Sequence, residues 1–194
     1  HYTNPVPSMS IVRFDPVKQN IQEGGYRIDK GTTLFSKPVN GTPCRFSTSQ
    51  AVQIWPVSVT DARIREPQKR VNGAVQVIEI DLQSFNKINL AKIDWQTLRF
   101  FLNGPHQHVF HLYELLFNHV CHIECEVQAP DGERVVMVFD PTTIRPVGFT
   151  VEEGMLPYSK RSFPAYLMLF EYFCFPEKFL FFDIFGLERI AGNS

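Results

Sequence analysis

With 194 residues and 44% hydrophobic residues, the chain is long enough to bury a core of its own without a metal or disulfide bonds. Its 19 basic and 20 acidic residues leave a net charge of -1, and its longest basic runs are two pairs, Lys69-Arg70 and Lys160-Arg161. Because binding of duplex or single-stranded nucleic acid needs a basic track, we expect no nucleic-acid partner.

The cysteines and the apolar segments bear on the compartment. The four cysteines lie in apolar stretches without the dense spacing of a disulfide scaffold, which indicates free thiols in the cytosol. The most apolar stretch, Pro164 to Gly186, is interrupted by charged residues before it reaches about 20 apolar residues, so we expect no transmembrane helix. The chain opens without Met and stops directly after an apolar segment. We therefore expect a single β-rich domain, residues 1–194, taken from a longer protein.

Short strand-like runs separated by Gly, Pro and Asn predict antiparallel β structure in the first part of the chain. The expected strands are Ser10 to Phe14, Thr32 to Ser36, Cys44 to Thr48, Val52 to Trp55 and Val57 to Ile64. A polar, turn-rich segment follows at residues 66–73. It is either a boundary between two units or, as we favour, a long hairpin loop.

A second group of elements follows this segment. Ala74 to Leu82 predicts a strand buried on much of both faces, and Leu98 to Leu102 has the same style. Asn103-Gly104-Pro105 predicts the start of a helix that runs to about Asn118 and packs onto the sheets. The polar face of this helix consists of Gln107, His111, Glu114 and Asn118.

The last elements alternate between strand and helix patterns. Val120 to Val127 alternates as a half-buried strand, and across a turn at residues 129–132 it pairs with Val135 to Phe139 in a hairpin. A second helix starts at Ser162 as N-cap and ends before Pro176, and the pattern of Phe179 to Phe185 predicts a buried strand. Together these patterns predict a mainly β, sandwich-like fold with two packed helices, for which α+β is the alternative label.

A cluster of potential metal ligands is the most specific chemical signal. Seven side chains fall within 20 residues: His106, His108, His111, His119, Cys121, His122 and Cys125. In an extended strand Cys121 and Cys125 face the apolar side and His122 the opposite side, so these three do not converge, and Cys-x-x-Cys spacing is missing. His108 and His111 could chelate from one helix face, but further ligands would have to come from elsewhere. We favour surface histidines, and keep a metal-dependent hydrolase as the weaker hypothesis.

Three further motifs are too weak to assign chemistry. Ser84 and Lys87 match the Ser-x-x-Lys pattern of penicillin-recognising enzymes, but the companion elements are missing. The segment Gly25 to Thr32 faintly resembles a phosphate loop, yet no helix pattern follows it, so a strand pair entered through a Gly-Gly turn is the better interpretation. Glu152 and Glu153 are adjacent and would face opposite ways, which does not suit a glycosidase. We therefore expect no catalytic, cofactor-binding or metal-binding residue and no cofactor.

Phenylalanine is concentrated near the end of the chain, where eight of the 18 Phe residues lie between residues 163 and 185. The helix Ala165 to Cys174 offers almost no polar face beyond Glu171. Such a helix either lies deep in the core, which we favour, or docks on another part of the protein or on a partner.

Several segments, taken in order, resemble one family. They are Pro7 to Phe14, Gly31 to Ser36, Pro43 to Thr48, Ile54 to Val57, Leu98 to Gly104, Leu112 to Leu116 and Glu171 to Phe182. This order resembles TssF (ImpG or VasA), the type VI secretion baseplate subunit, and Glu171 to Phe182 is the most specific segment.

The resemblance implies a non-catalytic structural subunit of the baseplate wedge, similar to a wedge protein of contractile phage tails. The implied partners are TssG, a second TssF copy, TssK and the sheath initiator TssE. The implied location is the bacterial cytoplasm, in a baseplate docked at the inner-membrane complex. The rival hypothesis from another class is a ligand- or carbohydrate-binding β-sandwich module, which would expose aromatic residues such as Trp55 or Trp95 on one concave face.

Overall fold

The computed structural model describes residues 5–16, 21–68, 73–85, 88–90, 93, 95–128, 134–157 and 163–193. The strands in these residues are β1 (Tyr26–Ile28), β2 (Thr33–Phe35), β3 (Arg45–Ser47), β4 (Val52–Ile54), β5 (Val57–Arg65), β6 (Val77–Ser84), β7 (Thr97–Phe101), β8 (Ile123–Gln128), β9 (Arg134–Phe139), β10 (Ile144–Pro146) and β11 (Phe181–Phe185). The helices are α1 (His106–Asn118) and α2 (Pro164–Cys174), with 3-10 helices η3 (Pro141–Thr143), η4 (Pro176–Leu180) and η5 (Leu187–Asn193).

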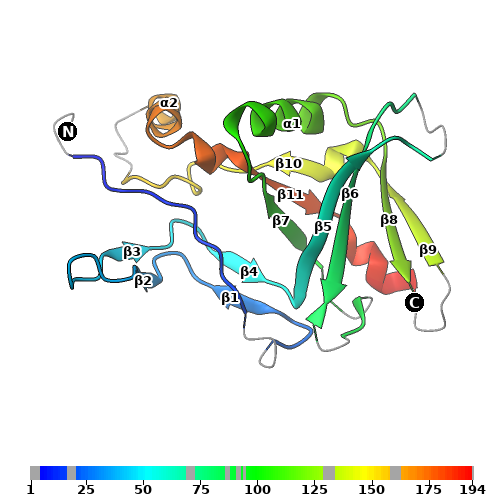
Figure 1. Ribbon diagram of the computed structural model, residues 1–194, viewed down its shortest axis with the longest axis horizontal. Helices are drawn as coiled ribbons and strands as arrows, with labels where there is room; N and C mark the ends of the chain where they lie inside the picture. The colour runs from blue at the N-terminus through cyan, green and yellow to red at the C-terminus, as the bar shows by residue number, and fades with distance from the viewer. Residues whose placement is uncertain are drawn as a thin grey trace.

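All strand pairs in the described residues are antiparallel. One three-stranded sheet has the order β10-β11-β7, and the other strands form the pairs β1–β4, β2–β3, β5–β6 and β8–β9 (Figure 1). The expectation of a mainly β fold with two helices is confirmed, although the strands are divided among small sheets rather than gathered into two large ones.

Most of the predicted strands are confirmed, with ends shifted by a few residues. The prediction of a strand at Ser10 to Phe14 was wrong, because residues 5–16 form no strand and have no strand partner among the described residues. A run of β-forming residues becomes a strand only when a neighbouring strand accepts its backbone hydrogen bonds. The last strand begins at Phe181 instead of Phe179, because η4 takes up the residues after Pro176.

The segment around residues 66–73 joins β5 to β6, and these two strands pair with each other along most of their length. Residues 69–72 of this connection lie outside the described residues. A register shift between Val59 and Asp61 interrupts the regular pairing of β5 with β6. The prediction that the strand Ala74 to Leu82 is buried on much of both faces was wrong, since Val75, just before β6, and Ile78 within it are exposed.

The main core lies beneath the strands of the second half of the chain. Its buried members are Trp55, Ile93, Trp95, Leu98, Met137, Phe139, Leu187 and Ile190. The indole N–H of Trp55 donates to the carbonyl of Thr97 at 2.9 Å, and that of Trp95 donates to Leu90 at 2.8 Å. Both tryptophans are therefore buried, hydrogen-bonded core residues rather than an exposed carbohydrate-binding platform.

Helix α1 is amphipathic, as its sequence predicts. All four residues of its predicted polar face are exposed, while Val109 and Leu116 are buried. The helix packs against β10 and η4, which confirms the prediction that it lies on a sheet. In the described residues neither helix is long and apolar enough to cross a membrane.

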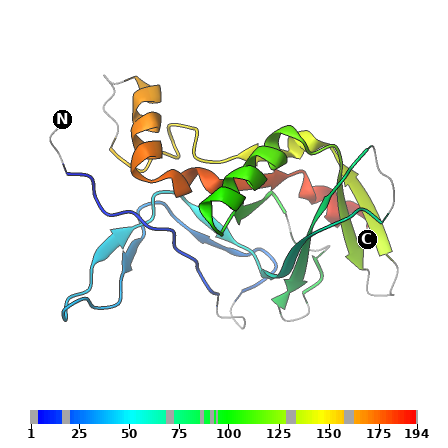
Figure 2. The ribbon, with the colours of Figure 1, turned by 45° about the horizontal axis from the view of Figure 1, so that its top comes forward.

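Helix α2 differs from the prediction that it lies in the core. The structure places its N-cap at Phe163 rather than Ser162, which lies outside the described residues, and Pro164 stands at its first turn. Its single buried residue is Glu171, Leu167 and Met168 are half-buried, and its other residues are exposed. Figures 1 and 2 show α2, in orange, at the end of the molecule opposite the β8–β9 hairpin.

Candidate protein interaction site

The outward surface of α2 and the residue before it form the largest group of exposed aromatic side chains in the described residues. We call this surface the α2 face; its members are Phe163, Tyr166, Leu169, Phe170, Tyr172 and Phe173. Exposed fractions range from 43% for Tyr172 to 80% for Phe173. Large exposed apolar surfaces are typical of interaction sites, so the α2 face is the candidate site for protein contact.

The sequence around α2 explains why the helix begins and ends where it does. Pro164 fits the first turn, where no backbone N–H is needed, and Pro176 cannot continue the helix. The backbone N–H of Phe175 closes the last turn on the carbonyl of Glu171 at 2.8 Å. The helix therefore runs for eleven residues with one charged residue.

That one charged residue attaches α2 to the rest of the molecule. The carboxylate of Glu171 accepts hydrogen bonds from the backbone N–H groups of Met155, at 2.8 Å, and Leu156, at 2.9 Å. Its other oxygen accepts from the ammonium of Lys178, which lies in η4. Because both side chains are buried and every acceptor is used, the pair forms a satisfied polar clamp at the base of α2.

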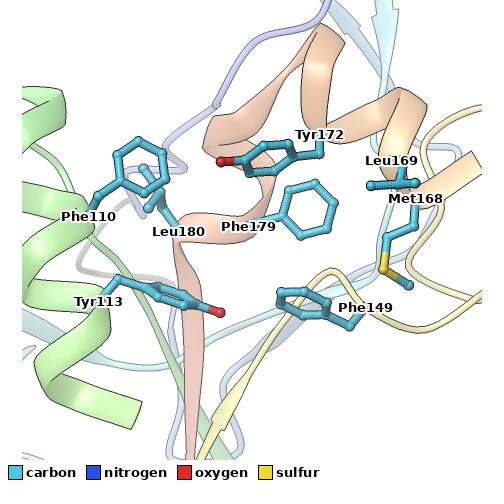
Figure 3. Close-up of a pocket in the computed structure, with 8 residues that line it drawn as sticks. All are labelled: Phe110, Tyr113, Phe149, Met168, Leu169, Tyr172, Phe179 and Leu180. Carbon is cyan, nitrogen blue, oxygen red and sulfur yellow. The ribbon is translucent and has the colours of Figure 1, made fainter. Parts of the chain in front are cut away.

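A groove separates α2 from α1 and continues the α2 face inward. It has a volume of about 300 Å³ and is lined by apolar and aromatic side chains: Phe110, Tyr113, Phe149, Met168, Leu169, Tyr172, Phe179 and Leu180. Figure 3 shows Phe110 and Tyr113 on one side, Tyr172, Leu169 and Met168 on the other, and Phe149 and Phe179 between them. Burial raises the pKa of Tyr113 to about 12, so its phenol stays neutral in this apolar setting.

A second polar network, centred on Arg99, holds the loop that precedes α2. Arg99 on β7 donates two hydrogen bonds to Asp183 on β11, at 2.7 and 2.8 Å, and a third to Gln50 at 2.7 Å. The hydrogen bond to Asp183 raises the pKa of the Arg99 guanidinium. The amide of Gln50 donates to the carbonyl of Glu153 at 3.3 Å. The network thus connects the central sheet, the N-terminal strands and the loop that precedes α2.

The histidine and cysteine cluster does not converge. The histidines lie beside carboxylates instead: His106 is 3.4 Å from Glu177, His119 is 3.1 Å from Glu114, and His122 is 2.8 Å from Glu124. Among the described residues, no three His, Cys, Asp or Glu side chains are arranged to hold a metal ion.

The two cysteines of this cluster occupy different settings. Cys121 lies exposed before β8 begins, so the prediction that it faces the apolar side of the strand was wrong. Cys125 does lie on the inner side of β8, and burial raises the pKa of its thiol. Half-burial of this kind keeps the thiol protonated and packed against the core.

The weaker motifs resolve into ordinary structure. Ser84 ends β6 opposite Val57, and Lys87 lies outside the described residues. The glycine-rich segment around Gly31 contains β1 and leads into β2 with no helix after it, and these strands pair with β4 and β3 rather than with each other. Glu153 accepts from the backbone N–H groups of Gly148 and Thr150, which makes it a loop-stabilising residue.

The sequence reasoning missed the Glu171–Lys178 clamp. The sequence pattern places both residues in an apolar stretch but does not indicate that they pair with each other. The signal that could have revealed the clamp is a pair of opposite charges, seven residues apart, inside a segment that is mostly apolar. Charged residues in such a setting are either exposed or paired with each other.

Comparison with known proteins identifies relatives along the whole chain. The sequence matches the family described as "Type VI secretion system, TssF" over residues 1–194. It is 31% identical over 201 residues to type VI secretion system component TssF1 of Pseudomonas aeruginosa, a match that covers 97% of this chain and 32% of the relative. The chain thus spans about a third of that relative's length.

A solved structure has the same fold. It is a chain of the TssK-TssF-TssG baseplate subcomplex determined by cryo-electron microscopy, with a TM-score of 0.73 and 22% sequence identity. The match covers 90% of this chain and 32% of that chain.

Proposed function

Because this chain belongs to the TssF family of type VI secretion proteins, we propose that it is a structural, non-catalytic part of a bacterial secretion baseplate. On this proposal the chain acts by binding neighbouring subunits and holding them in a fixed arrangement. The observation that carries the proposal is the family match over residues 1–194, together with the α2 face, which suits protein contact rather than substrate turnover.

Two of the proposed partners are supported by a solved relative. The solved relative belongs to a TssK-TssF-TssG subcomplex, which supports TssK and TssG as partners of this chain. A second TssF copy and the sheath initiator TssE are further partners on the same proposal. The proposed location is the cytoplasm, where the baseplate would meet the inner-membrane complex.

Features of the structure support a scaffold role. The Glu171–Lys178 clamp and the Arg99–Asp183–Gln50 network tie separate parts of the chain together through buried or half-buried polar contacts. Satisfied networks of this kind favour one rigid arrangement, which a structural subunit needs. The proposal requires neither a cofactor nor a catalytic residue.

Co-purification of the natural full-length protein with its neighbours tests the proposal. The protein would carry an affinity tag and be co-expressed with TssG, TssK and TssE from the same bacterium, beside a version that lacks residues 1–194. We expect TssG and TssK to elute with the intact protein at a fixed ratio and to be reduced with the deleted version. A folded, tagged protein that elutes without any of these subunits would refute the proposal.

A further inference from the structure

We infer that the loop of residues 148–156 couples the N-terminal strands to α2, so that a displacement of one loosens the other. The two coupled parts are the strands β1 to β4 and the helix α2 with η4, which follows it. The inference goes beyond the proposed function, because it concerns communication within the chain and holds whichever subunits the chain binds.

The loop is held together by its own hydrogen bonds. The carboxylate of Glu153 accepts from the backbone N–H groups of Gly148, at 2.9 Å, and Thr150, at 3.0 Å. The backbone N–H of Gly154 donates to the carbonyl of Val151 at 3.1 Å. Because these bonds connect the start of the loop to its end, a shift of one loop residue is passed on to the others rather than absorbed.

The N-terminal strands hold one side of the loop. Lys30, between β1 and β2, donates from its ammonium to the carbonyl of Glu152 at 2.9 Å. Gln50, between β3 and β4, donates from its side-chain amide to the carbonyl of Glu153 at 3.3 Å. The amide oxygen of Gln50 in turn accepts from Arg99 on β7 at 2.7 Å. Two separate connections of the N-terminal strands therefore bind adjacent carbonyls of the loop.

Helix α2 and η4 hold the other side of the loop. The backbone N–H groups of Met155 and Leu156 donate to the carboxylate of Glu171 at 2.8 and 2.9 Å. Gly148 lies against η4: a Cβ at this position would be 3.2 Å from the carbonyl oxygen of Lys178, and its φ of 102° also favours glycine. The loop thus packs closely on the same Glu171–Lys178 pair that anchors α2.

The two sets of contacts are coupled because they fall on nearly consecutive residues. Residues 152 and 153 bind the N-terminal strands, residues 155 and 156 bind Glu171, and one glycine separates them. Figures 1 and 2 show the loop, in yellow, at the base of α2. A shift of the β1–β4 strands therefore moves residues 155 and 156 relative to Glu171. By thermodynamic reciprocity, a shift of α2 acts equally on the strands.

Hydrogen exchange of α2 after a substitution in the N-terminal strands tests this coupling. Gln50→Leu, made in the natural full-length protein, removes the bonds of Gln50 to Glu153 and Arg99, and Gln50 makes no hydrogen bond to α2 itself. Because one hydrogen bond contributes about 1 kcal/mol, we expect amide exchange in α2 to rise about fivefold. The matched control is Gln53→Leu, which removes a bond to Gly24 within the N-terminal part and should leave exchange in α2 unchanged.

The β8–β9 hairpin, at the end of the molecule opposite α2, separates coupling from a general loss of stability (Figure 1). Exchange that rises in α2 but not in this hairpin supports the inference. Equal rises in α2 and the hairpin would overturn it, as would exchange in α2 that is the same for Gln50→Leu and Gln53→Leu. The measurement uses no other subunit, so its outcome is independent of whether the proposed function holds.

A second pair of variants decides the question if Gln50→Leu does not fold. Lys30→Met removes the exposed bond to Glu152, and Lys37→Met, at an exposed lysine just after β2, is its control. We expect Lys30→Met to raise exchange in α2 about twofold, because a bond at an exposed site contributes at the low end of the usual range. Lys37→Met should leave exchange in α2 unchanged. In that case, equal exchange of α2 in the two lysine variants would contradict the coupling.

Discussion

The carboxylate of Glu171 and the ammonium of Lys178 meet inside the molecule, where 1% and 4% of the two side chains are exposed. The two residues belong to consecutive helices, α2 and η4, so their contact fixes the angle at which one follows the other. Burying an ion pair gives little net stability, because desolvation offsets much of the attraction. The Glu171–Lys178 pair instead orients α2, since it determines which side of the helix faces outward.

Removing one member of this pair should be costly. We expect Lys178→Met to lower the free energy of unfolding by about 3–5 kcal/mol, because it leaves a buried carboxylate without its cation. Glu171→Gln should cost a similar amount by leaving the buried ammonium unpaired. The double variant should cost less than the sum, because it leaves neither a buried carboxylate nor a buried ammonium without its opposite charge.

Urea unfolding of the four proteins measures this cycle. Asp15→Asn, which breaks the exposed pair with Arg13, is the control and should change stability by less than about 0.5 kcal/mol. Purely additive effects of Lys178→Met and Glu171→Gln would mean that the two residues are not coupled.

Arg99 should not tolerate replacement by lysine. A lysine ammonium cannot reproduce the fork that donates two parallel bonds to Asp183 and a third to Gln50. We expect Arg99→Lys to lower the free energy of unfolding by about 1–3 kcal/mol. Arg27→Lys, in an exposed pair with Asp29, is the matched control. Equal, small effects of both substitutions in thermal unfolding would show that the network adds nothing.

Alkaline pH should destabilise the protein through Tyr113. Burial raises the pKa of this phenol from 10 to about 12 in the folded state. Below pH 10 the group is neutral in both states and its burial carries no charge penalty. Between pH 10 and 12 the unfolded chain releases the proton more readily, so stability falls as pH rises.

Tyr113→Phe removes this titration and tests the effect. The unfolding free energy of the original protein minus that of Tyr113→Phe should decrease as pH rises from 10 to 12. A difference that stays constant over that range would show that the folded state does not raise the pKa of Tyr113.

The histidines of α1 should be dispensable for assembly. His108 and His111 are exposed, and the described residues provide no third ligand near them. We expect the double substitution His108→Ala and His111→Ala to leave co-purification with TssG and TssK unchanged, and elemental analysis to find no bound zinc in either protein. Stoichiometric zinc that disappears with the substitution would instead favour the metal-dependent hydrolase.

Local patterns predicted the elements whose conformation is set by their own residues. The polar spacing of Gln107, His111 and Glu114 located the exposed face of α1, because a helix of 3.6 residues per turn aligns these positions. The alternation around Cys125 located the inner face of β8 for the equivalent reason in a strand.

The sequence patterns could not predict the long-range contacts, such as which strands pair and which side of a helix is buried. The short strands β1 and β2 are adjacent in sequence yet pair with β4 and β3, and nothing local to either strand specifies that partner. An apolar helix such as α2 suits a core and an interface equally well, so composition favoured the wrong answer. The deciding feature was the long-range environment of Glu171, which single-residue polarity does not reveal.

Hydrogen exchange of α2 tests the central claim most directly. Backbone amide exchange of Pro164–Cys174 would be compared between the full-length protein alone and the same protein assembled with its baseplate neighbours, with β2 as the reference segment. Docking of another subunit on the α2 face should slow exchange in α2 and leave β2 unchanged. Equal exchange of α2 in the free and assembled protein would contradict the claim that this helix is an interaction surface.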